Sequence, residues 1–152
     1  TLKIKADSGY SSTEDFRISP DQYARVKAIL SPKPERPKVI YISHQIGGNV
    51  TANLEHIEDI ARELNLSKEN VIPFAPYFLS AHCLDDDKIN ERARGIRNNV
   101  FWLESGMIDE VHLYGDRISP GMVEEVKLAR LLKIPVVAKT PGTENDLKPI
   151  LN

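Results

Sequence analysis

From residue 38 onward, short apolar runs alternate with longer stretches in which apolar residues recur every three or four positions. Short continuous runs are typical of strands buried on both faces, and the longer spacing is typical of amphipathic helices. The expected strands are 39–43, 70–74, 109–114 and 134–138. The expected helices are 51–64, a stretch from the aspartates at 85–87 to about 105, and 119–132, with a final turn after Pro141. This alternation predicts a parallel sheet with helices on both faces.

The first 36 residues follow a different pattern. Residues 2–6 alternate apolar and polar side chains and 15–18 are suited to a returning strand, so we expect a β-hairpin. Ser19-Pro20 predicts a helix start, and the prolines of 31–37 favour an extended linker. The chain therefore divides into a hairpin–helix appendage, 1–36, and a main domain, 37–152. For the main domain we expect an α/β, flavodoxin- or Rossmann-like three-layer sandwich with four to five parallel strands.

Composition narrows the class of protein. The 152 residues are 41% hydrophobic and 28% charged, with a formal net charge of -2, which is ordinary for a globular domain. Without a basic block, a nucleic acid polymer or an anionic membrane is not expected as the main partner. Cys83 is the single cysteine, so no intramolecular disulfide is possible. The chain has no membrane-length apolar run or leader and begins at Thr1; we expect a processed terminus and a soluble, cytoplasmic domain.

Two loops follow expected strands, at the edge where open parallel sheets bind ligands. The first is 45–49, which contains Ile46, Gly47 and Gly48. Paired glycines suit either close approach of the backbone to a ligand or a tight turn, and both interpretations stand equally. His44 directly follows the strand and is a candidate for the cleft, although a lone histidine there is more often structural.

The second loop, 115–119, leads into a helix. Ser119 is suited to cap it with Pro120 as its first residue, which leaves backbone N–H groups available to an anion. Glu125, in the second turn, falls within the broad apolar arc and has no basic residue three or four positions away. An inward carboxylate without a local partner favours a functional role. The alternatives are a position at the edge of the arc or a distant arginine partner.

Two further groups are weaker candidates. Asn98 and Asn99 end a run of arginines, where their amides are suited to sugar hydroxyls or a base, or form a polar helix face. His82, Cys83 and the aspartates at 85–87 mix hard and soft ligands, so no metal site is expected, and no cofactor.

Two motifs resemble the nucleoside 2-deoxyribosyltransferase-like superfamily, which includes the deoxynucleoside 5'-monophosphate N-glycosidases. Tyr41-Ile-Ser-His-Gln-Ile-Gly-Gly48 resembles the first strand and glycine loop of that family. Ser119-Pro-Gly-Met-Val-Glu-Glu-Val-Lys-Leu-Ala129 resembles its Ser-x-Gly-x-x-x-Glu-x-x-x-Ala signature. The resemblance covers about 38–138, and the phrase at 114–122 is similar to uncharacterised bacterial and phage domains of this fold.

The resemblance implies an N-glycosidase or N-deoxyribosyltransferase that acts on a nucleoside or nucleotide. Glu125 would be the nucleophile that forms a covalent glycosyl-enzyme, and Ser119 would contact a 5'-phosphate. Tyr41, Ile46, Gly47 and Gly48 would line the base and sugar. The further candidates for substrate binding are His44, Asp116, Gly121 and Met122. Family members are commonly dimers or tetramers whose sites a neighbouring subunit completes, so the resemblance also implies a homo-oligomer.

One residue departs from the family pattern. Where the family carries an aspartate on the helix before the third strand, the match here is Asn99, and an amide cannot act as an acid. Either Asp109, Asp116 or a residue of a partner subunit takes that role, or catalysis is weak. The alternative function is a non-catalytic module of the same fold that binds a nucleotide or an ADP-ribose-like ligand.

Overall fold

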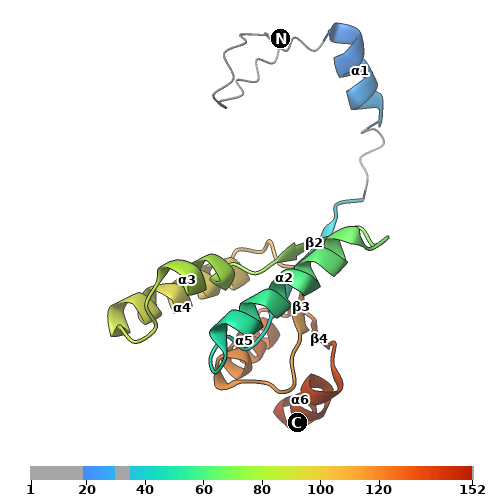
Figure 1. Ribbon diagram of the computed structural model, residues 1–152. Coiled ribbons are helices and arrows are strands. Elements are labelled where there is room, and N and C mark those ends of the chain that lie inside the picture. Colours follow the sequence, from blue (N-terminus) through green and yellow to red (C-terminus); the bar gives the residue numbers. More distant parts are fainter. Residues whose placement is uncertain (1–18, 30–34, 152) are drawn as a thin grey trace. The chain divides into compact units, whose positions relative to one another are not determined.

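The computed structural model describes residues 19–29 and 35–151, so the expected hairpin lies outside the described residues. The chain divides into two units, 1–36 and 37–152. In the first, helix α1 spans Pro20–Ile29 (Figure 1). Its start is a reciprocal capping box, because Gln22 N donates to Ser19 Oγ (3.1 Å) and Ser19 N donates to Gln22 Oε1 (2.9 Å). The predicted helix start at Ser19-Pro20 is confirmed.

The second unit contains a four-stranded, all-parallel sheet, which confirms the predicted α/β class. Its strands are β1 (Lys38–Ser43), β2 (Val71–Phe74), β3 (Glu110–Leu113) and β4 (Val136–Ala138). The spatial order is β2-β1-β3-β4, with Ile40 of β1 opposite Pro73 of β2 and Glu110 of β3. Because every strand runs the same way, the loops after β1 and β3 meet at one edge of the sheet.

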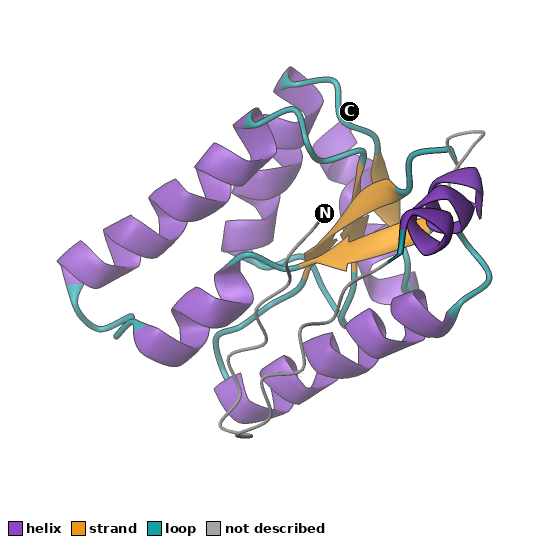
Figure 2. Ribbon diagram, turned by 90° about the horizontal axis from the view of Figure 1, so that it is seen from above, coloured by secondary structure: helices purple, strands orange, loops and turns teal. Residues whose placement is uncertain are grey.

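Helices cover both faces of this sheet (Figure 2). They are α2 (Val50–Leu66), α3 (Tyr77–Cys83), α4 (Ile89–Glu104), α5 (Pro120–Leu131) and α6 (Pro141–Leu151). The sequence pattern did not predict α3, and the expected final turn is a full helix, α6. The prolines around residues 73–76 obscured α3, since Pro76 stands at its N-cap rather than inside it.

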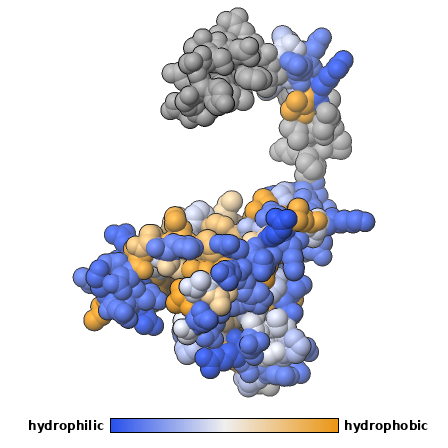
Figure 3. All heavy atoms as spheres, viewed as in Figure 1, coloured by the Kyte–Doolittle hydropathy of each residue, from blue (hydrophilic) through white to orange (hydrophobic). Residues whose placement is uncertain are grey.

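The core lies between the sheet and its helices. β1 and β3 provide Tyr41, Ile42 and Val111, each with no exposed surface, and α5 adds Val126, which is also fully covered. Some apolar side chains reach the surface on α3 and α4, as Figure 3 shows; Ile89 is 85% exposed. Among the described helices, none combines the length and apolar character that crossing a membrane requires.

Candidate functional site

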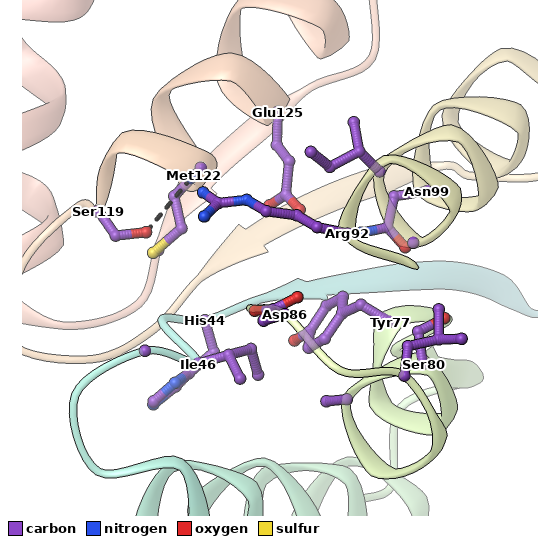
Figure 4. Close-up of a pocket in the computed structure, with 16 residues that line it drawn as sticks. His44, Ile46, Tyr77, Ser80, Asp86, Arg92, Asn99, Ser119, Met122 and Glu125 are labelled. Atoms are coloured by element: carbon purple, nitrogen blue, oxygen red, sulfur yellow. Dashed lines mark hydrogen bonds between the residues drawn. The ribbon is translucent and has the colours of Figure 1, made fainter. Parts of the chain in front are cut away.

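A cavity of about 360 Å³ opens where the loops after β1 and β3 meet α3, α4 and α5. That volume lies within the range of small-molecule sites. The predicted site residues that line it are His44, Ile46, Gly47, Asn99, Ser119, Gly121, Met122 and Glu125. The site thus combines parts of the chain that are far apart in sequence (Figure 4).

Glu125 is held by two hydroxyl groups of β1. Tyr41 Oη donates to Glu125 Oε1 (2.8 Å) and Ser43 Oγ donates to Oε2 (2.6 Å). Residues 41 and 43 point to the same face of the strand because side chains alternate along it. Both carboxylate oxygens are therefore fixed, and their partners are hydroxyls of β1 rather than the distant arginine that the sequence left open.

Burial governs the ionisation of this carboxyl group. Desolvation raises the pKa of Glu125 above its ordinary value of 4.5, and the hydrogen bonds from Ser43 and Tyr41 lower it in part. Burial, together with the nearby Glu125, raises the pKa of Tyr41 well above 10, so its hydroxyl stays a donor. The two hydroxyls act to stabilise the ionised carboxylate in an otherwise unfavourable environment.

The amino end of α5 faces the same cavity. Ser119 is its N-cap, with Oγ accepting from Met122 N at 3.4 Å, as predicted. Pro120 is the first helical residue, and the helix dipole favours negative charge at this end. In Figure 4 the side chain of Arg92 extends from α4 toward Met122 and Ser119. This corner of the cavity is positively polarised and suited to an anionic group.

His44 forms a wall of the cavity. It is 7% exposed, its Nδ1 donates to the Gln45 carbonyl (2.6 Å), and its Nε2 therefore accepts from His56 Nδ1 (2.9 Å). Burial lowers the pKa of His44 and the charge of His56 adds to this, while the Gln45 carbonyl and Asp116 oppose it. With both nitrogens engaged inside the protein, this imidazole has no free proton to exchange with a ligand.

The two glycines of the first loop have different roles. Gly47 lines the cavity, and a side chain there would meet no atom within 4 Å. Gly48 does not line it and has a φ of +97°, which glycine adopts without strain. The tight-turn interpretation is therefore confirmed for Gly48, and close approach of a ligand at Gly47 stays a prediction.

Asn99 lies on α4 beside Glu125. Its Oδ1 is buried without a hydrogen-bond partner among the described residues. Asn99 and Glu125 also line a second cavity of about 380 Å³ between α4 and α5, where apolar walls come from Val100 and Leu128. The two side chains thus line both the first cavity, whose walls are mixed in polarity, and the second, whose walls are mostly apolar.

Several predicted residues lie outside the cavity lining. Tyr41 has no exposed surface and lies beneath Glu125, which it contacts. Asp116 is exposed but does not line the cavity. Asp109 precedes β3 at the opposite edge of the sheet, where its Oδ2 accepts from Val39 N (2.7 Å), so it cannot take the role of the family aspartate. Gly48 contributes only the turn.

The sequence analysis missed four polar lining residues, namely Tyr77, Ser80, Asp86 and Arg92. Tyr77 also donates from its hydroxyl to the carbonyl of Ile42 (2.5 Å), which ties α3 to β1. No periodic signal marks these residues, because α3 and the loop after it reach the site only through the tertiary fold. The aspartates at 85–87 were the available signal, but the sequence analysis considers them only as a helix start and as metal ligands.

No group of three or more histidine, cysteine, aspartate or glutamate side chains suited to a metal occurs among the described residues. Comparison with curated proteins and with solved structures finds no significant match. One family model, that of a domain of unknown function (DUF7768), matches residues 38–139, which include the sheet, α4 and the Glu125 site. The chain therefore belongs to the DUF7768 family.

Proposed function

We propose that this protein is an N-glycosidase or N-deoxyribosyltransferase that cleaves the bond between base and sugar in a nucleoside or nucleotide. The observation that carries the proposal is Glu125, with both carboxylate oxygens held by β1 hydroxyls in a cavity large enough for a small ligand. A fixed carboxylate that burial partly shields from water is suited to attack an anomeric carbon and to stabilise an oxocarbenium-like transition state.

In this mechanism a Glu125 oxygen bonds to the anomeric carbon as the bond to the base nitrogen breaks. The bond's electron pair leaves with the base, which takes a proton from water, and a glycosyl ester on Glu125 remains. Water resolves the ester in a hydrolase, and a second base resolves it in a transferase. Ser119 and the amino end of α5 would bind an anionic group such as a 5'-phosphate, and the Asn99 amide would orient a sugar hydroxyl.

The test is chromatography of the protein incubated with nucleosides, deoxynucleoside monophosphates and NAD, with detection of free base. We expect base release from at least one compound and its loss by about a thousandfold or more in Glu125→Gln, as when other nucleophiles are removed. The matched control is Glu124→Gln, because Glu124 is exposed and pairs with Lys127 (2.8 Å). Full activity in Glu125→Gln refutes the assignment of the nucleophile.

A specific observation favours a second function, binding without turnover. Asn99 stands where the family pattern has an aspartate, and an amide supplies no proton near neutral pH. In that case the cavity holds a nucleotide or an ADP-ribose-like ligand intact. Thermal stabilisation by members of the same panel, together with no free base after exhaustive incubation, supports this second function and excludes the first.

The resemblance to that superfamily also supports a proposal on the oligomeric state of the protein and its place in the cell. We infer a homo-oligomer, dimer or tetramer, in the cytoplasm. The apolar walls of the second cavity and Ile96 on α4, which is 54% exposed, support an assembly that covers this face. A mass measurement at micromolar concentration that finds only monomer refutes the oligomer.

A further inference from the structure

Asp86 is the one carboxylate other than Glu125 among the described residues that line the 360 Å³ cavity. It lies in the loop between α3 and α4, and its side chain is exposed. In Figure 4 the carboxyl end of Glu125 points toward the side of the cavity where Asp86 is drawn. The two carboxyl groups therefore belong to one chamber, one held in its interior and the other in contact with bulk water.

The neighbours of Asp86 fix the loop and leave its carboxylate free. Asp85 Oδ1 accepts from Asp87 N (3.1 Å), and Glu91 Oε2 accepts from Asp85 N (2.7 Å). Lys88 Nζ bridges Asp85 (3.4 Å) and Glu91 (3.2 Å). Within the described part of the chain, no hydrogen bond or ion pair engages the Asp86 side chain, so its oxygens are available to water or a ligand.

Other candidates for proton transfer are excluded by their positions. Asp109 lies at the opposite edge of the sheet, and Asp116 does not line the cavity. Both nitrogens of His44 bond within the protein. Asn99 carries an amide, which acts neither as an acid nor as a base near neutral pH. Of the described groups in the cavity, Asp86 is left to move a proton.

We propose that Asp86 is the general base that activates water against the glycosyl ester of Glu125, which makes the reaction a hydrolysis; this inference rests on the proposed function. The Asp86 carboxylate takes a proton from water as the water oxygen bonds to the anomeric carbon. The ester bond to Glu125 breaks, and its electron pair returns to the Glu125 carboxylate. Asp86 then gives the proton to bulk water, so the water consumed balances the free sugar and free base formed.

The experiment compares Asp86→Asn with Asp87→Asn, which makes the same charge change one residue away and outside the cavity lining. The probes are deoxynucleosides, the four deoxynucleoside 5'-monophosphates and NAD. In Asp86→Asn we expect steady-state base release to fall about 100-fold or more, within the usual range for a general base. The first turnover is retained as a burst, and intact-mass analysis after acid quench shows a glycosyl adduct on the Glu125 peptide. Asp87→Asn stays within twofold of the unsubstituted chain.

Rescue by azide distinguishes a general base from a residue whose loss only disturbs the structure. As an anion it attacks the anomeric carbon without a base, so it restores turnover in Asp86→Asn and yields a glycosyl azide. Two results overturn this inference: equal steady-state rates in the two variants, or a slow Asp86→Asn variant that shows neither a burst nor rescue by azide. In both cases base release by the unsubstituted chain leaves the proposed function standing. Absence of base release from every probe by the unsubstituted chain overturns both.

Discussion

Removing the Ser43 hydroxyl tests whether Glu125 is an ionised, hydrogen-bonded carboxylate in the folded protein. Ser43 has no exposed surface, and its hydroxyl lies 2.6 Å from Glu125 Oε2. A hydrogen bond to a charged group contributes about 1.5–3 kcal/mol, and one between neutral groups about 0.5–1.5 kcal/mol. Ser43→Ala should therefore destabilise the protein by about 1–2 kcal/mol more when Glu125 is ionised than when it is protonated.

The sign of the pH dependence follows from the raised pKa of Glu125. A carboxyl whose pKa is higher in the folded than in the unfolded state contributes stability below its ordinary value of 4.5, and this contribution is lost as pH rises through the folded pKa. Because the Ser43 hydrogen bond lowers that pKa, its removal makes the loss larger. The stability gap between Ser43→Ala and the unsubstituted chain should widen with pH.

A double-mutant cycle isolates this effect from other titrating groups. Urea unfolding of the unsubstituted chain, Ser43→Ala, Glu125→Gln and the double variant, at about pH 5 and about pH 8, gives the coupling between the two residues at each pH. We expect the coupling at the higher pH to exceed that at the lower by about 1–2 kcal/mol, equivalent to roughly 2–8 °C in melting temperature for a chain of this length. Additive effects at the higher pH, or equal coupling at both, refute the reasoning.

Three other substitutions test separate features. Gly142→Ala should lower the urea midpoint by an equivalent of about 1–3 kcal/mol or more, since an added Cβ would lie 1.9 Å from a backbone carbonyl oxygen before α5; an unchanged midpoint contradicts this contact. Asn99→Asp should raise the pKa of Glu125 further by placing a second carboxylate in the same cavities, which carbon-13 NMR of the Glu125 carboxyl measures; an unmoved titration places the two groups too far apart. His56→Ala should raise the pKa of His44 by removing a neighbouring positive charge, and a lower or unchanged imidazole titration in nitrogen-15 NMR contradicts this.

Much of the fold was predictable because apolar periodicity reports burial directly. The run Val39–Ser43 and the stripe Leu54–Leu64 led to β1 and α2, whose ends differ from the prediction by at most two residues. The strand order β2-β1-β3-β4 and helix α3 were not predicted. Strand order depends on long-range contacts, and α3, Tyr77–Cys83, is too short for a helical period to emerge beside its flanking prolines.

The candidate site was predictable where one element carries its own signal. Ser119 and Glu125 occur on a single helix, so cap chemistry and the apolar arc located both. Asp86 and Arg92 reach the cavity only because α4 packs against α3 and α5 in the folded chain. Their local sequence is that of any charged helix start, and it contains no information on which of the three aspartates lines the cavity.

The partners of Glu125 show what a sequence can still reveal about a buried strand. A strand covered on both faces carries apolar residues at nearly every position, so its hydrophobic pattern does not show which side chains share a face. In β1, however, the hydroxyl-bearing residues Tyr41 and Ser43 are two apart and thus share a face. Two hydroxyls on one face of the buried part of a strand need an acceptor from the element packed there, and α5 offers Glu125 within its own apolar arc. The strand's donors and the helix's inward carboxylate each lack a local partner, and each accounts for the other.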